Sequence, residues 1–224
     1  MNPGIFILGG GVGLLGAIVA GSIYYEKRRR EALEQYCLTR GYRFEQERPG
    51  AEGQLIPICS LFDRGHSRKW RLTVTGSVGG RPFTAFEYRY TTGGGKSSQV
   101  HIESVMLWDS PDLKLPKFSL SPEGFFNRIG QKFGVQDFDF DEDPEFSKAY
   151  QLQGDNEAAV RALFTGTRRR LLMMAAPDTG RRTRHMLAGA GTKLLWWQDM
   201  RLPVDEKLDA FLTAGDQVYR AFLG

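Results

Sequence analysis

The longest apolar run in the chain lies at its amino terminus. Between Gly4 and Tyr25 there is no charged residue, and Glu26 and four consecutive basic residues follow directly. About 20 residues at 1.5 Å per residue cross a hydrocarbon core of roughly 30 Å. No face of this segment is polar, whereas an amphipathic helix on a globular domain would have one. The pattern therefore predicts one transmembrane helix at 4–25, with Tyr24 and Tyr25 in the interfacial aromatic belt.

The charges that flank this run predict an orientation. The basic residues are Lys27, Arg28, Arg29 and Arg30, whereas residues 1–3 have no charged side chain. The positive-inside rule then places the amino terminus outside and the remaining chain in the cytoplasm, at the inner (plasma) membrane of a bacterium. A cleaved signal peptide would carry its positive charge before the apolar run, whereas here the charge follows the run, so we do not expect one. We expect the four basic side chains to contact anionic lipid headgroups, at roughly 1 kcal/mol each.

Small residues recur every four positions in the same run, at Gly9, Gly13, Ala17 and Gly21. They share one helix face, where a second backbone can approach closely. This stripe predicts packing against another membrane protein or a second copy of the chain, and the alternative is that it faces lipid. Residues 11–16 also match GxGxxG, but a dinucleotide site requires a second strand that ends in an acidic residue about 20 residues further on. Here the basic cluster occupies that window, and no βαβ alternation follows.

After the basic cluster, the pattern predicts a continued helix to residue 40, ended by Gly41, which tolerates left-handed geometry. Residues 48–53 are typical of a turn, and residues 55–62 indicate a short strand interrupted by Pro57. Period-two alternation then predicts three strands at 71–78, 82–91 and 99–108. The Gly79-Gly80 pair favours a tight hairpin between the first two. We expect an antiparallel β meander here.

The carboxyl-terminal third is dominated by helical patterns. Asp155 is placed to cap a helix at 156–164. Other helices are expected at 122–129, 144–149, 167–175 and 204–223, with a hairpin at 183–189 and 193–198. Strands in runs and helices in runs indicate an α+β fold. The expected organisation is a transmembrane anchor at 1–25, a juxtamembrane helix and linker at 26–48, and a soluble α+β domain at 49–224.

Several short motifs resemble those of bacterial single-span membrane proteins whose soluble domain has no assigned function. They are residues 137–140 (DFDF), 144–147 (PEFS), the pair Glu157 and Arg161, and the hairpin at 86–97. The resemblance implies a single span and a mixed domain, and it implies no activity.

Two motifs mimic ligand sites. Residues 93–97 (GGGKS) resemble the end of a phosphate-binding P-loop. The motif requires a glycine five residues before Gly95, where this chain has Tyr90, and it requires a helix afterwards, where this chain has strand-like sequence. A hairpin loop is the simpler interpretation. Residues 137, 139 and 141 are spaced like the first calcium ligands of an EF-hand loop. That loop also requires glycine at its sixth position and glutamate at its twelfth, and these positions hold Glu142 and Lys148 here. We expect the acidic block to dock a basic partner instead, through Asp137, Asp139, Asp141, Glu142 and Asp143.

Composition adds little to this picture. The net charge of +4 is too small to indicate nucleic acid, and Cys37 and Cys59 have no zinc-type spacing. No catalytic signature is present, so neither a cofactor nor a metal is expected. The sequence favours a non-enzymatic, membrane-tethered accessory or scaffold protein that binds membrane lipid and a protein partner. The alternatives are a membrane-anchored enzyme acting on a nucleotide or lipid, and a module that binds lipid or nucleic acid.

Overall fold

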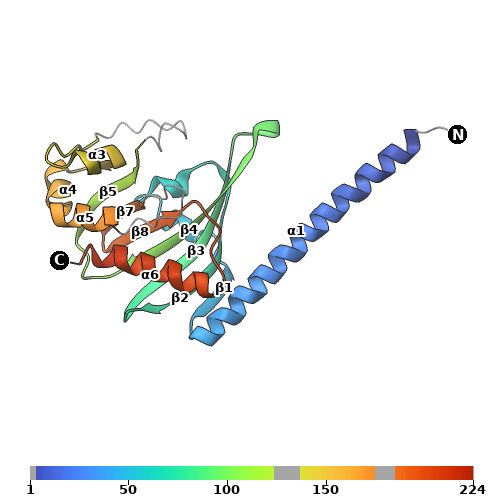
Figure 1. Ribbon diagram of the computed structural model, residues 1–224, viewed down its shortest axis with the longest axis horizontal. Coiled ribbons are helices and arrows are strands. Elements are labelled where there is room, and N and C mark those ends of the chain that lie inside the picture. The colour runs from blue at the N-terminus through green and yellow to red at the C-terminus, as the bar shows by residue number, and fades with distance from the viewer. Residues whose placement is uncertain (1–3, 124–136, 175–184, 224) are drawn as a thin grey trace.

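The computed structural model describes residues 4–123, 137–174 and 185–223, except for the side chains of residues 4–16 and 18. Within this part of the chain, eight strands form a single antiparallel sheet in the order β1-β2-β3-β4-β8-β7-β5-β6. This confirms an α+β fold with an antiparallel sheet (Figure 1). The strands are β1 Arg43–Glu47, β2 His66–Val78, β3 Arg81–Thr92, β4 Gln99–Asp109, β5 Leu115–Pro122, β6 Tyr150–Gly154, β7 Met186–Gly191 and β8 Lys193–Gln198.

The central meander is confirmed, since β2 pairs with β3 and β3 with β4. Gly79 and Gly80 join β2 to β3 with φ angles of 57° and 79°. Positive φ at both central residues is the type I′ geometry that fits the twist of a hairpin. The predicted hairpin of β7 and β8 also forms, around Gly191.

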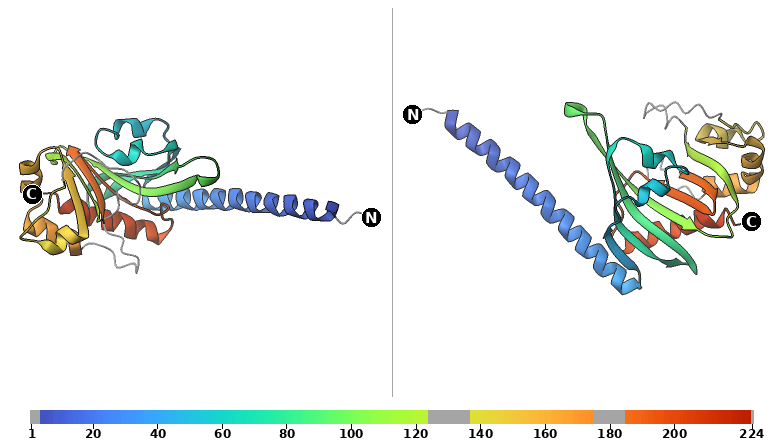
Figure 2. Two further views of the ribbon diagram at one scale, coloured as in Figure 1. Left: turned by 90° about the horizontal axis from the view of Figure 1, so that it is seen from above. Right: turned by 180° about the vertical axis from the view of Figure 1, so that it is seen from behind.

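The two faces of the sheet bury separate apolar layers. Trp196 and Trp197 show the division, because the first belongs to one buried cluster and the second to the other. The first cluster packs under the long helix α6 (Glu206–Arg220) and under α3, α4 and α5. The second lies under two short 3-10 helices, η1 Ala51–Gln54 and η2 Ser60–Asp63. Figure 2 shows α6 and the η1–η2 segment on opposite faces of the sheet.

Four of the predicted carboxyl-terminal helices are present, and their bounds differ from the expected ones by at most three residues. One predicted cap is wrong, since Asn156 and not Asp155 accepts the hydrogen bond from the Ala159 amide, at 3.0 Å. Asp143 caps α3 in the same way. The predicted helix at 122–129 lies outside the described residues beyond 123. The helices are α3 Pro144–Ala149, α4 Glu157–Leu163, α5 Gly166–Met174 and α6 Glu206–Arg220.

The predicted strand at 55–62 is wrong. This segment has no strand partner among the described residues, and it forms the turn that follows η1 and the start of η2. Its apolar residues Leu55, Leu61 and Phe62 are buried against one face of the sheet, in the second apolar cluster. A short apolar run cannot distinguish a strand from a covering loop by its pattern alone. Strands β1 and β6, five residues each, were not predicted.

The predicted transmembrane helix at 4–25 requires correction. Residues 4–25 belong to α1, one helix of 37 residues running from Gly4 to Arg40. Over the residues that the structure describes, no helix has the length and apolar character needed to cross a membrane. A hydrocarbon core requires about 20 apolar residues. The predicted continuation of the helix to residue 40 is confirmed, and the helix ends before Gly41, whose φ angle is 71°.

A buried ion pair fixes α1 to the sheet. Arg29 Nη2 donates to Glu87 Oε2 of β3 and to the carbonyl of Leu202, both at 2.6 Å. The Leu202 amide donates to the same carboxylate at 3.2 Å. Arg71 of β2 lies 3.5 Å from the other Glu87 oxygen and 3.0 Å from Glu26. Helix α1, two strands and the loop before α6 therefore meet at one carboxylate.

We predict that Glu87→Ala lowers the free energy of unfolding by about 3–5 kcal/mol, because it leaves the buried Arg29 guanidinium without its counter-charge. Chemical denaturation measures this. Lys27→Ala, a change of an exposed cation on the same helix, should cost far less. Arg29→Met with Glu87→Leu should recover part of the loss, since no buried charge remains. Equal costs for Glu87→Ala and Lys27→Ala would contradict the role of the pair.

Candidate functional site

The stretch of α1 before the ion pair carries exposed apolar side chains. Val19, Ile23, Tyr24 and Tyr25 are each 57–65% exposed. This part of α1 projects away from the sheet (Figure 1), so no other element covers it. A contiguous exposed apolar surface of this kind marks an interaction site.

The basic cluster that follows is divided by the fold. Lys27 is exposed and lies 3.9 Å from Glu31, and Arg28 is exposed over the ring of Tyr24. Arg30 is half-buried. Arg29 is buried against Glu87, so it is not available to a lipid headgroup. Three of the four predicted headgroup contacts therefore remain accessible.

Glu26 sits between the exposed stretch and the domain. Partial burial tends to raise the pKa of its carboxyl, but the hydrogen bond and charge of Arg201 outweigh this, with help from Arg29 and Arg71. The net result is a pKa below the ordinary value, and the carboxylate remains ionised. The acid at the end of the apolar run is therefore part of the clamp on α1.

The stripe of small residues is partly described. Gly9 and Gly13 lie in α1 at positions whose side chains are not described. Ala17 is exposed, and a Cβ added at Gly21 would meet nothing within 4 Å. The surface around these two positions is open to a close approach by another helix.

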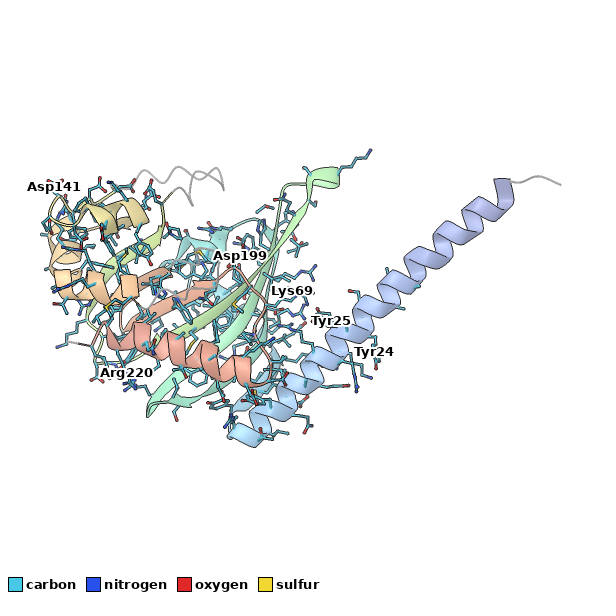
Figure 3. All side chains as sticks on the ribbon, viewed as in Figure 1. Tyr24, Tyr25, Lys69, Asp141, Asp199 and Arg220 are labelled. Atoms are coloured by element: carbon cyan, nitrogen blue, oxygen red, sulfur yellow. The ribbon has the colours of Figure 1, made fainter. Side chains whose placement is uncertain are left out.

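Most of the predicted acidic docking block is engaged within the domain. Asp137 accepts hydrogen bonds from the side chains of Gln151 and Gln153. Glu142 and Asp143 both pair with the buried Arg169, at 3.1 and 2.8 Å. Asp139 and Asp141 are exposed and alternate with the buried side chains of Phe138 and Phe140. Figure 3 places Asp141 at the end of the molecule opposite Tyr24 and Tyr25.

The other basic clusters are structural where they are described. Arg168 donates to the backbone carbonyls of Leu163 and Ala221, and Arg169 joins α5 to α3 through the acidic pair. The cluster at 181–184 lies outside the described residues.

The glycine-rich motif forms the tip of the β3–β4 hairpin. Residues 95–97 make one short 3-10 turn, η3, and β4 begins at Gln99. No helix follows whose amide groups could hold a phosphate in the way that a P-loop requires.

A buried carboxyl that the sequence did not single out lies on the second face of the sheet. Glu103 of β4 is 3% exposed, and burial raises its pKa to about 8, with a further increase from Asp199. The charge of Arg64 and a hydrogen bond with Tyr90 act in the opposite direction. The Tyr90 ring stacks on His101, with centroids 4.7 Å apart.

This cluster has the pKa shift of an active site but lacks access. At 3% exposure, a substrate cannot reach the Glu103 carboxyl. A strongly shifted pKa without a cleft is typical of a structural polar network. The sequence contained a signal for it, because Glu103 falls in register with Val105 and Leu107 on the apolar side of the strand.

A groove of about 250 Å³ lies between the η1–η2 segment and strands β5 and β6. Ile56, Pro57 and Ile58 line its apolar side, and Lys117 and Asp155, 3.5 Å apart, lie on its polar side. Among the described residues, no group of His, Cys, Asp or Glu side chains is arranged to hold a metal ion. Cys37 and Cys59 are buried free thiols, and burial raises the pKa of each to about 11.

The fold and these sites define a class: an α+β domain on one antiparallel sheet, with a long amino-terminal helix clamped to it. No protein-family model matches the chain, and no curated protein matches its sequence. Among solved structures, its fold is similar to that of the mycobacterial trehalose monomycolate transport factor A, TtfA. The TM-score is 0.56 at 13% sequence identity, over 87% of this chain and 92% of that chain. At this identity, the likeness shows a shared fold.

We predict that Glu103→Gln changes how stability depends on pH. Because the pKa is about 8 in the folded state against 4.5 ordinarily, the folded protein holds a proton that the unfolded chain releases. The wild-type free energy of unfolding should therefore fall as pH rises from about 4.5 to about 8. Glu103→Gln should flatten this fall and gain on the order of 3 kcal/mol at high pH. Denaturation at several pH values measures it, with the exposed Glu34→Gln as control. A parallel pH profile for both variants and the wild type would exclude a buried neutral Glu103.

Proposed function

We propose that this protein is a membrane-associated accessory or scaffold protein, in which α1 contacts lipid and the α+β domain binds a protein partner. The observation that carries the proposal is the exposed apolar stretch at residues 19–25, held clear of the domain by the buried Arg29–Glu87 pair. Exposing this apolar surface to water is costly, and contact with lipid would cover it.

The order of residues along α1 supports lipid as this environment. Apolar Val19 and Ile23 come first, then Tyr24 and Tyr25, and the exposed cation Lys27 follows. Aromatic rings favour the boundary between hydrocarbon and headgroups, and cations favour the anionic headgroup layer. The order of side chains along the helix (apolar, then aromatic, then cationic) therefore matches the order of layers in a bilayer from hydrocarbon to headgroup.

Two features support a protein partner. The small residues Ala17 and Gly21 leave room for a neighbouring helix to approach the backbone of α1. The exposed carboxylates of Asp139 and Asp141 can meet a basic surface, and Figure 3 places Asp141 at the end of the molecule opposite Tyr24 and Tyr25. The structure of similar fold is described as a transport factor, which agrees with an accessory role in transport.

The alternative of an enzyme acting on a nucleotide or lipid has less support. The loop at residues 93–97 lacks the helix that a phosphate site requires, and Glu103, with its raised pKa, is inaccessible. A scaffold needs only surfaces, and the described surfaces are at opposite ends of the molecule.

Membrane association should depend on the exposed stretch of α1. Val19→Asp with Ile23→Asp places two carboxylates one turn apart, and each costs about 2–3 kcal/mol against lipid. We expect the double variant to move from the membrane fraction of cells to the supernatant. Leu38→Asp changes an equally exposed apolar residue at the domain end of α1 and should stay with the membranes. Wild-type protein in the supernatant would refute the proposal.

Partner binding should depend on the small residues. Ala17→Leu with Gly21→Leu keeps the helix apolar but fills the space that a second backbone would occupy. We expect this variant to reach the membrane and to lose the protein that co-purifies in mild detergent. Val19→Phe adds bulk on the opposite side of the helix and should retain it. Full retention by the double variant would transfer partner binding to the α+β domain.

A further inference from the structure

A second element projects from the domain on the same side as α1. It is the outer half of the β3–β4 hairpin, residues 89–102, called the arm here. Strand β8 pairs with β4 only from Ser104 to Asp109, and β2 pairs with β3 only as far as Thr91. The tip of the arm, residues 92–99, therefore extends beyond both neighbouring strands. Residues 93–100 are all exposed. Figure 1 and both views of Figure 2 show the arm and the free part of α1 leaving the domain in the same general direction.

The charge of the arm has one sign. Residues 88–102 include no Asp or Glu, whereas Arg89 and Lys96 are both cationic. Lys96 sits at the tip, between glycines and serines with no bulk of their own. Exposed Val100, 51% accessible, adds an apolar contact beside it.

At the base of the arm, Arg89 stands directly opposite Lys69 of β2. Like charges placed opposite each other destabilise a sheet. The nearby carboxylates Glu26 and Glu87 pair with other cations, Arg29, Arg71 and Arg201. Among the described residues, no ion pair of Lys69 or Arg89 relieves this repulsion. Arg89 is two residues from Glu87, so both cations lie on the face of the sheet that holds α1. Figure 3 labels Lys69 on this part of the sheet, and Tyr24 and Tyr25 on the projecting part of α1. An external anion would satisfy both cations at once.

We propose that the arm is a second lipid contact, in which Lys69, Arg89 and Lys96 bind the anionic headgroups of the same bilayer that α1 contacts. This inference rests on the proposed membrane association and adds to it a preference for anionic lipid. Each cation near an anionic surface contributes about a fivefold gain in binding, and the gain is screened by salt. Two contacts from separate elements would also fix the angle between the domain and the bilayer, which a single helix cannot do.

The test uses the full chain with Lys96→Cys labelled by an environment-sensitive, water-soluble maleimide dye. The native Cys37 and Cys59 are 0% and 3% exposed, so the dye reacts selectively at position 96. We expect a blue shift on vesicles of phosphatidylcholine with phosphatidylglycerol and a smaller one on phosphatidylcholine alone. Lys117→Cys, in β5 at the other end of the sheet, should show no shift on either.

A charge-removal variant gives an independent measurement. Lys69→Gln with Arg89→Gln and Lys96→Gln should lower binding to the anionic vesicles by about 100-fold and leave binding to neutral vesicles unchanged. Lys117→Gln serves as the matched control. A protein that binds vesicles while the dye at position 96 stays in water overturns the arm and leaves the lipid contact of α1 intact. A protein that binds neither kind of vesicle overturns both proposals.

Discussion

The contact between Arg29 and Glu87 determines how the rest of the molecule is used. A buried pair is costly to desolvate, and it persists here because the carboxylate also accepts from the Leu202 amide while the guanidinium donates to the Leu202 carbonyl. The helix therefore cannot slide or roll on the sheet without leaving a buried charge unpaired. This geometric specificity, more than net stability, is what the pair contributes. The apolar residues before Glu26 project from the domain and stay exposed (Figure 1).

The two buried carboxylates of neighbouring strands show how environment assigns a role to one residue type. Glu87 faces α1 and has Arg29 and Arg71 within 3.5 Å, so its charge is matched. Glu103 lies on the other face, under the η1–η2 segment, where burial dominates and raises its pKa to about 8. The first fixes the docking of a helix. In the second, burial outweighs the nearby charge of Arg64, so the carboxyl favours its neutral form.

The sequence predicted what local pattern controls. The meander follows from alternation around Gly79 and Gly80, and α6 from its apolar stripe. Strands β1 and β6 were not predicted, because five residues at a sheet edge show little alternation. Residues 55–62 were predicted as a strand, because a covering loop buries apolar residues as a strand does. Arg29 was assigned to lipid because its neighbours 27, 28 and 30 are also basic. Only the sheet that approaches from 58 residues further along the chain distinguishes it. The transmembrane interpretation depended on the lack of charge between residues 4 and 25, whereas over the described residues no helix is long and apolar enough to cross a membrane.

The scaffold role that we propose requires surfaces held in a fixed relation, and this fold can hold them with few parts. The apolar stretch of α1 and the basic arm leave the domain on one side, and both are attached to β3: the arm contains its outer end, and α1 is bound to Glu87 within it. The acidic residues Asp139 and Asp141 lie at the other end, on a segment fixed by the Arg169 pairs with Glu142 and Asp143. The two ends are joined by one continuous antiparallel sheet with an apolar layer on each face. A sheet packed in this way resists bending, so a protein docked at the acidic end would be held at a set distance and angle from whatever α1 and the arm bind.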